Sequence, residues 1–396
     1  MRITEIKVIA LRDEASGEAA SWNPQAKNNE LNSGYDLTLV KVLTDEGVTG
    51  IGQCEAPSMV IDAIIHNSMG LESLIVGEDP SEVQRLWQKM YNGTGLYGRR
   101  GVTIGAIGAV ETALCDIAAK IRGIPVHQLV WKSFTTTATE ALPDRLIRPY
   151  VTVYPPGDDL VQLTERLHRA ISTGASAVKI EEWTGQFGNG DIKKDIAVIK
   201  TAREVIGDER DLMIDVQNKW GDVSQALKTI EAIEDYQPYF IEAPLPADNL
   251  QGYRKLVEST SIPIAVGDWG FSGRHEFRSL LKDIGIDIVQ PSSVRAGGIH
   301  EILNIAEEAY TYGALCIPHA WCHMIGVSAE LHIAAVSPCT PYIEFPMAFP
   351  PSPIIEDLLI PKISLREDGM IDLPNRPGLG FDLNEDVVNE YSVSPY

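Results

Sequence analysis

The chain has 396 residues, and its 44% hydrophobic content is ample for one large core or two domains. Its 33 Lys and Arg against 55 Asp and Glu give a formal charge of −22, which argues against nucleic acid or an anionic membrane as a partner. The five cysteines are scattered, with no Cys-x-x-Cys pair, so they indicate neither a disulfide framework nor a zinc cluster. Without an apolar signal segment or a long apolar run, we expect a cytoplasmic protein with no transmembrane helix.

Residues 3–56 predict an antiparallel meander with one long loop. ITEIKVIAL (3–11) and YDLTLVKVLTDEGVTGIGQCEA (35–56) alternate with period two, and Asp45-Glu46-Gly47 supplies a turn within the second stretch. Residues 13–34 are polar, with Gly, Pro and Asn, and predict a loop long enough to serve as a lid. Apolar residues at helical spacing then predict helices over 58–70, 80–91 and 103–122.

From about residue 148 the chain alternates short apolar runs with amphipathic stretches. The runs cover 148–154, 175–180, 211–216, 238–244, 262–268, 286–291, 314–320 and 340–346. They carry Val and Ile without polar alternation, which is typical of strands buried on both faces. Eight strand–helix units predict a parallel (β/α)₈ barrel, with a doubly wound sheet as the alternative. The end of the chain, including ISLREDGMIDLPNRPGLGFDL (363–383), predicts strands and turns that return to the meander.

Polar side chains stand at the C-terminal ends of these runs, where a barrel builds its active site. They are Lys179, Asp215, Glu242, Asp268, Gln290, His319 and Glu344. One such acid alone usually caps a helix, but three carboxylates on consecutive strands would repel each other unless a cation lay among them. Oxygen ligands suit Mg²⁺ better than zinc. We therefore predict that Asp215, Glu242 and Asp268 bind Mg²⁺, with Mn²⁺ as an alternative, and that Asn218 fixes a ligand or touches substrate.

A metal beside Lys179 and His319 suits one kind of chemistry. Metal bound to a carboxylate substrate can stabilise the charge left when a proton leaves the neighbouring carbon. One residue would remove that proton, and another would return a proton or protonate a leaving group.

With these motifs, the chain resembles the enolase superfamily, mandelate racemase subgroup, over nearly its whole length. The motifs are VKIEE (178–182), MIDVQNKW (213–220), FIEAPL (240–245), AVGDW (265–269), DIVQPSSVRAGGI (287–299), IPHAW (317–321) and YIEF (342–345). The resemblance implies an N-terminal α+β capping domain (1–125) with lid loop 13–34, a modified TIM barrel of (β/α)₇β form (126–354), and a C-terminal segment (355–396) packing back on the cap. It also implies Mg²⁺ on the three carboxylates, an enediolate intermediate, and homo-oligomers from dimer to octamer.

The chain departs from the subgroup's pattern at two positions. Glu181 stands where the second lysine of Lys-x-Lys is the base, and Ser292 stands where an aspartate pairs with the strand-seven histidine. Because residues 179 and 181 point to the same side of a strand, Glu181 is a candidate base, or else an ion-pair partner of Lys179 or Arg295. His319 could be a structural cap, and Asp287 or another acid could orient it. Glu344 matches a glutamate that binds the substrate carboxylate.

These residues predict an acid-sugar dehydratase that acts on aldonates or aldarates and forms 2-keto-3-deoxy acids. Lys179, Glu181 and His319 are the catalytic candidates, with His319 protonating the departing 3-hydroxyl. Further substrate-binding candidates are Trp22 of the lid, Tyr97, Arg100 and Arg295; Tyr97 and Arg100 could instead belong to an ion-paired turn. The alternatives are a racemase, epimerase or cycloisomerase on the same scaffold, and a barrel that has lost catalysis and serves as a binding protein.

Overall fold

The computed structural model describes residues 1–13, 35–134, 147–153, 159–181, 191–321, 324–347 and 352–394. Nearly all of the predicted lid, including Trp22, lies outside these residues.

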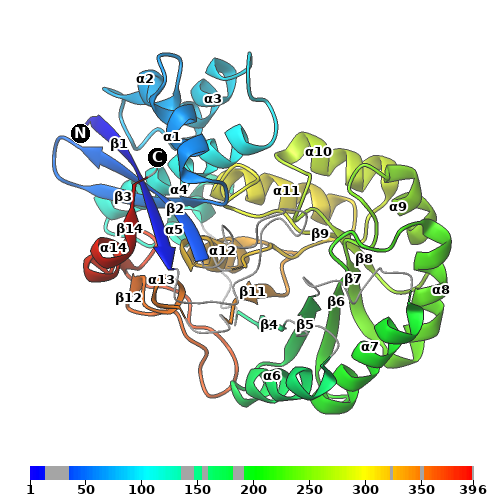
Figure 1. Cartoon of the computed structure of the whole chain (residues 1–396). Helices are drawn as coiled ribbons and strands as arrows, with labels where there is room; N and C mark the ends of the chain where they lie inside the picture. Colours follow the sequence, from blue (N-terminus) through cyan, green and yellow to red (C-terminus); the bar gives the residue numbers. More distant parts are fainter. Residues whose placement is uncertain are drawn as a thin grey trace.

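An antiparallel sheet and a group of helices form the cap (Figure 1). The sheet has the order β14-β1-β2-β3, with β1 at Ile3–Asp13, β2 at Tyr35–Thr44, β3 at Thr49–Cys54 and β14 at Ser392–Val393. The helices are α1 (Ser58–His66), α2 (Leu71–Ile75), α3 (Val83–Gly93), α4 (Val102–Ile121) and α5 (Val126–Phe134). The meander is confirmed, and Gly47 takes the left-handed backbone (φ +80°) that its turn needs. The helix predicted over 58–70 is present as α1 but ends at His66, and the separate helix α2 begins after Gly70, where any side chain would strike the Ile65 carbonyl.

Helix α4 joins the cap to the rest of the molecule. It has the length and apolar composition of a membrane span, yet 94% of its apolar window is buried inside the fold. Gly52 of β3 approaches the α4 backbone at Ala109, and Gly108 of α4 approaches Gly298 from the other side, both too closely for a side chain to fit. A helix that is apolar all round and packed on both sides is a core helix.

The second sheet is parallel and contains all eight predicted strands. They are β4 (Pro149–Val153), β5 (Ala177–Glu181), β6 (Asp211–Asp215), β7 (Pro238–Glu242), β8 (Ile264–Val266), β9 (Ile288–Val289), β10 (Leu315–Cys316) and β11 (Ile343–Phe345). The sheet order β10-β9-β8-β7-β6-β5-β4-β11 follows the chain and brings β11 back beside β4. A doubly wound sheet would instead reverse its order part-way, so the barrel-type prediction is confirmed.

Helices cover the outside of the curved sheet, as Figure 1 shows for α6 to α11. They are α6 (Leu160–Ser172), α7 (Ile192–Ile206), α8 (Val223–Ile233), α9 (Leu250–Val257), α10 (Arg274–Ser279), α11 (Ile299–Thr311) and α12 (Met324–Val336), with the 3₁₀ turn η2 (Glu234–Tyr236) and the π-helical turn η3 (Leu280–Ile284).

The C-terminal segment contains α13 (Pro353–Glu356), β12 (Leu359–Ile360), β13 (Asp382–Leu383), α14 (Glu385–Tyr391) and β14. The predicted return of the last residues, from about 355, to the meander is confirmed, although residues 363–383 themselves take no part in the cap sheet: β13 pairs with β12, and the residues before it form only isolated bridges. Gly and Pro interrupt the alternation there. The return to the cap sheet is made by β14, where Val393 pairs with Ala10 of β1.

A layer of buried side chains fills the inside of the curved sheet. Its members are Tyr150, Ala177, Met213, Phe240, Ala265, Ile288, Ile317 and Tyr342. Side chains two residues apart on a strand share a face. Met213, Phe240, Ile317 and Tyr342 each lie two residues before one of the predicted polar residues, so this apolar layer is the floor on which the polar site stands.

Candidate active site

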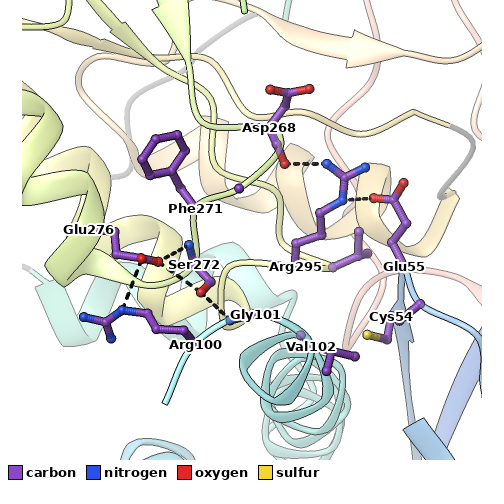
Figure 2. A pocket seen from close by; sticks show the side chains of 14 residues that line it. Cys54, Glu55, Arg100, Gly101, Val102, Asp268, Phe271, Ser272, Glu276 and Arg295 are labelled. Atoms are coloured by element: carbon purple, nitrogen blue, oxygen red, sulfur yellow. Dashed lines mark hydrogen bonds and ion pairs between the residues drawn. The ribbon is translucent and has the colours of Figure 1, made fainter. Parts of the chain in front are cut away.

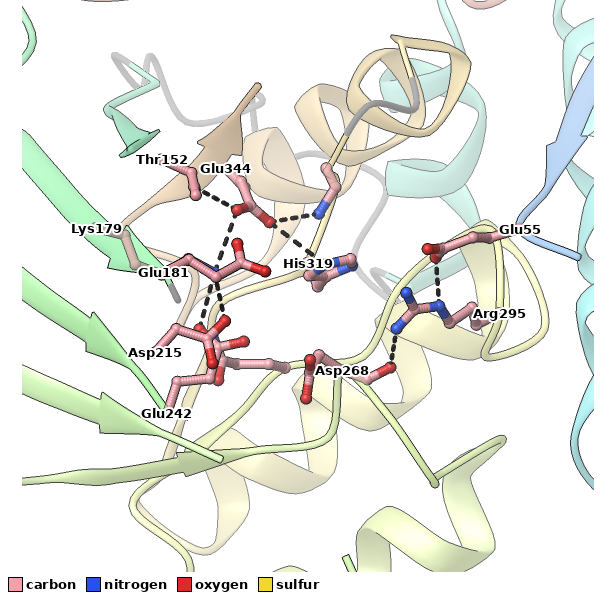
Figure 3. Close-up of polar contacts among 12 residues, drawn as sticks. Glu55, Thr152, Lys179, Glu181, Asp215, Glu242, Asp268, Arg295, His319 and Glu344 are labelled. Carbon is pink, nitrogen blue, oxygen red and sulfur yellow. Dashed lines mark hydrogen bonds and ion pairs between the residues drawn. The ribbon is translucent and has the colours of Figure 1, made fainter. Parts of the chain in front are cut away.

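The polar side chains at the strand ends converge above this floor (Figure 3). Lys179, Asp215, Glu242, Asp268, His319 and Glu344 are all buried, with at most 3% of each exposed. The parallel register aligns Glu181 with Asp215 and Asp215 with Glu242. The structure thus brings together every polar residue that was predicted from the strand ends.

Lys179 lies at the centre of a group of acids. Its Nζ is 2.9 Å from Glu242 Oε2, 3.2 Å from Glu344 Oε1 and 3.6 Å from Asp215 Oδ2. Burial alone lowers the pKa of Lys179, but Glu242 and then Glu344 outweigh burial and raise it. Lys179 is therefore held as an ammonium ion that donates to carboxylates and has no lone pair to offer.

Asp215, Glu242 and Asp268 can each place an oxygen within 4.8 Å of the other two. Two bare charges at about that distance repel by roughly 3 kcal/mol at an effective dielectric constant of about 20. Burial first, and then the other acids, raise the pKa of Asp215 to about 7, of Glu242 to about 8 and of Asp268 to about 7. In the described part of the chain, Glu242 Oε1 and Asp268 Oδ1 are buried and accept no hydrogen bond. These oxygens fit a hard divalent cation, which would relieve the repulsion.

Strained turns after β6 and β7 place these acids side by side. Gln217 (φ +55°), Asn218 (φ +60°) and Ala243 (φ +45°) all have left-handed backbones, which cost of order 1–3 kcal/mol at such residues. Hydrogen bonds between the two turns stabilise these strained backbone conformations: Val216 N donates to Glu242 O at 3.0 Å, and Asn218 N to Ala243 O at 2.7 Å. Strain that neighbouring strands hold in place is typical of functional sites.

Glu181 faces the site beside Lys179, as the alternation of a strand requires. Gln217 Nε2 donates to Glu181 Oε1 at 2.6 Å and to Asp215 Oδ2 at 3.2 Å. Glu181 Oε2 is buried and has no hydrogen-bond partner among the described residues. Burial, followed by the charge of Asp215, raises the pKa of Glu181. Gln217, which was not predicted, bridges Glu181 and the carboxylate triad. The backbone of Asn218 joins the two turns, and its contact with a ligand or substrate stays a prediction.

Glu344 connects Lys179 to His319. Its Oε1 accepts from Thr152 Oγ1 at 2.5 Å, its Oε2 accepts from Ala320 N at 3.0 Å, and Oε2 lies 3.9 Å from His319 Nε2. Burial alone would raise the pKa of Glu344, but the charge of Lys179 and the hydrogen bonds from Thr152 and Ala320 outweigh it and hold the pKa at about 2. Glu344 is therefore an ionised acceptor. Thr152 was not predicted.

His319 is a buried, neutral imidazole, because burial lowers its pKa to about 3. Its Nδ1 has no hydrogen-bond partner in the described part of the chain. The expectation that Asp287 might orient it fails, because Asp287 stands at the other end of β9, where its carboxylate accepts from Ile264 N at 2.9 Å. His332, also buried, contacts His127 instead.

A cavity of about 460 Å³ lies beside Asp268, between the cap and the barrel (Figure 2). Arg295 lines it, donating to the Asp268 carbonyl and forming an ion pair with Glu55 at the end of β3. Arg100 lines it too, with its Nε 3.3 Å from Glu276 Oε1. The predicted residue Tyr97 lies apart from this cavity and donates to the Met69 carbonyl within the cap. Glu55, like Gln217 and Thr152, was not predicted.

Comparison with known proteins identifies the family. Residues 162–387 match the family Enolase C-terminal domain-like, and residues 22–130 match the Mandelate racemase / muconate lactonizing enzyme, N-terminal domain. The chain belongs to the enolase superfamily. Within this superfamily, it is similar to an arabinonate dehydratase of Saccharolobus solfataricus (28% identity, covering 90% of each chain) and to a D-galactonate dehydratase of Xanthomonas oryzae pv. oryzae (31% identity, covering 90% of this chain and 91% of the relative).

A solved structure of the same superfamily fold has a different activity. The crystal structure of the 3,6-anhydro-D-galactonate cycloisomerase from Zobellia galactanivorans matches the whole of both chains with a TM-score of 0.84 and 26% identity. The similar proteins thus include two sugar-acid dehydratases and one cycloisomerase.

Proposed function

We propose that the protein is a Mg²⁺-dependent acid-sugar dehydratase acting on aldonates or aldarates. It removes the proton at C2, next to the carboxylate, and expels the 3-hydroxyl as water; the resulting enol becomes a 2-keto-3-deoxy acid. The observation that carries the proposal is the buried arrangement of the Asp215, Glu242 and Asp268 triad around Lys179, with Glu181 on the same strand as Lys179 and His319 just beyond β10. The similarity to arabinonate and D-galactonate dehydratases supports it.

Hydrogen-bond accounting favours Glu181 as the base. Lys179 Nζ lies within 3.6 Å of three carboxylates, so it is a cation that offsets the negative charge of the site and has no lone pair with which to take the C2 proton. Glu181 keeps one oxygen that accepts no bond from the described residues, while Gln217 fixes the other. A carboxylate that has taken the C2 proton can deliver it to the departing 3-hydroxyl on the same face, which balances the loss of water.

Asp215, Glu242 and Asp268 are the residues that would hold Mg²⁺, or Mn²⁺ in its place. The bound ion would offset the negative charge that develops on the substrate carboxylate and C2 as the proton leaves. An ionised Glu344 only accepts hydrogen bonds, so it does not bind a substrate carboxylate directly. Its role in the proposal is to orient Lys179 and, through its charge, His319. Arg295 and Arg100 face the cavity beside Asp268, which gives room for the distal end of a sugar acid.

We place the protein in the cytoplasm as a homo-oligomer of two to eight subunits, with a small carboxylate as its substrate. The acidic composition supports this location, as do the buried cysteines Cys54, Cys115 and Cys316, which form no disulfide. The oligomer is an analogy with the superfamily.

The test is to incubate the protein and Mg²⁺ with a library of aldonates and aldarates and to assay 2-keto-3-deoxy acids. We expect turnover of one stereochemical class, lost in Asp268→Asn because the triad then lacks an anionic ligand. If metal is shown to bind but no acid in the library yields a 2-keto-3-deoxy acid, the proposed dehydration is contradicted.

A cycloisomerase is the second candidate, favoured by the likeness to the Zobellia galactanivorans enzyme. Ring opening or closure without loss of water would identify it. Solvent deuterium entering C2 without loss of water would instead identify a racemase or epimerase, and metal binding with no exchange on any acid would indicate a barrel that has lost catalysis.

A further inference from the structure

Ser292 and His319 lie just beyond the ends of the neighbouring strands β9 and β10, at the same height. The hydrogen-bond ladder between β9 and β10 continues beyond both strands: Ile317 N donates to Val289 O at 3.0 Å, and His319 N to Pro291 O at 3.2 Å. In a parallel ladder these bonds pair Ile317 with Gln290 and His319 with Ser292. Paired residues point to the same side of strands about 4.8 Å apart. The backbone register therefore sets residues 292 and 319 side by side.

Each of these two side chains contains a buried polar atom in need of a partner. His319 is 3% exposed and Ser292 1% exposed, and neither His319 Nδ1 nor Ser292 Oγ has a hydrogen-bond partner within the described ranges. A buried polar atom left without a hydrogen bond destabilises the fold, because it has lost its bonds to water and gained none in return. A serine hydroxyl can rotate to donate, and a single buried water can bridge two polar groups.

The other side of the imidazole decides where its ring proton lies. His319 Nε2 is 3.9 Å from Glu344 Oε2, too far for a hydrogen bond but close enough for the charge to act. Glu344 is ionised and can only accept, so it favours the proton on Nε2 and leaves the lone pair on Nδ1. The other charges that face the ring are Arg295, Glu55 and Lys179. The ring of His319 is buried among charges of both signs, and burial disfavours the second proton that would make the ring an imidazolium.

We propose that the Ser292 hydroxyl holds one buried water that donates a hydrogen bond to Nδ1 of His319, and so fixes a neutral imidazole that presents Nε2–H to the substrate. Ser292 is then a positioning residue, and His319 is a hydrogen-bond donor. With no lone pair at Nε2, His319 cannot take the proton from C2. A neutral imidazole can still stabilise negative charge on a substrate oxygen. The proposal rests on the proposed function only in naming that oxygen as the departing 3-hydroxyl.

The tautomer can be read directly from ring ¹⁵N shifts, because a protonated and a bare ring nitrogen resonate far apart. We would label the histidines of the full chain with ¹⁵N, add Mg²⁺, and assign His319 by its loss in His319→Gln. The expected result is one dominant form with Nε2 protonated and Nδ1 bare, unchanged between pH 5 and 9. An imidazolium at pH 7, or a protonated Nδ1 with a bare Nε2, in the wild-type chain would overturn the proposal.

Variants at 292 test the role of the serine. Ser292→Ala should move the Nδ1 shift towards that of an unbonded lone pair. Ser292→Asp should draw a proton onto Nδ1 and bring the titration of His319 into the measured range. Ser293→Ala is the matched control, since Ser293 Oγ donates to Glu330 Oε1 at 3.2 Å, and it should leave the His319 shifts unchanged. An unchanged Nδ1 shift in Ser292→Ala would refute the serine's role. The shifts need no turnover, so failure of the dehydratase assay would leave this result standing.

Discussion

The metal-free triad makes a quantitative prediction for Mg²⁺ binding. The pKa values of Asp215, Glu242 and Asp268 are about 7, 8 and 7 without metal, raised chiefly by burial. With those values the three groups hold roughly two protons between them at pH 7 and almost none at pH 9. Because a bound cation requires ionised ligands, binding at pH 7 should release about two protons. The association constant should therefore rise by roughly 10- to 100-fold per pH unit near pH 7 and level off by pH 9.

Isothermal titration calorimetry measures this release directly. Titrations of Mg²⁺ at pH 7 in two buffers with different ionisation enthalpies give the number of protons displaced, and a repeat at pH 9 gives the limit. Asp268→Asn is the control, which should lose most of the affinity. An affinity that does not depend on pH, or a proton release near zero at pH 7, would refute the reasoning that burial holds these acids protonated.

Three other predictions concern single side chains. Glu181→Gln should slow exchange of the C2 proton by about 10²- to 10⁴-fold with Mg²⁺ affinity largely kept, as measured by NMR in D₂O; normal exchange would exclude Glu181 as the base. Gln217→Leu should lower kcat by roughly 10- to 100-fold, because it removes the 2.6 Å hydrogen bond to Glu181. The control Gln162→Leu, at an exposed position of α6, should leave kcat unchanged. His332 is neutral in the fold with its pKa lowered by burial to about 3, so only the unfolded chain gains its proton below about pH 6.5. The contribution of His332 to the free energy of unfolding is thus lost as pH falls from about 6.5 towards 3. The free energy of unfolding of His332→Gln, measured by urea unfolding, should therefore fall with pH less steeply than that of the wild type, by up to about 1.4 kcal/mol per pH unit; an equal dependence on pH would contradict this.

Much of the barrel could be predicted because its signals are local. Each strand is a short apolar run, and its last polar residue, such as Asp215 or Glu242, marks the face on which the site is built. Alternation along β5 put Lys179 and Glu181 on the same side, as the structure has them.

The parts that were missed depend on backbone turns and on distant contacts. Gln217 reaches Glu181 only because it takes a left-handed backbone that a glutamine rarely adopts. Glu55 meets Arg295 across the boundary between cap and barrel, a contact that no local pattern reveals. Arg100 and Tyr97 have the right chemistry for a sugar acid, but the contacts of Arg100 with Glu276 and of Tyr97 with Met69 depend on how the cap folds.

The most direct test of the central claim is a ¹H NMR experiment in D₂O on the acid sugar that is turned over best. With Mg²⁺ present, the account predicts that the C2 proton and the 3-hydroxyl are lost together and a 2-keto-3-deoxy acid accumulates. In Glu181→Gln both losses should stop. Loss or exchange of the C2 proton with the 3-hydroxyl retained, or full activity in Glu181→Gln, would contradict the account.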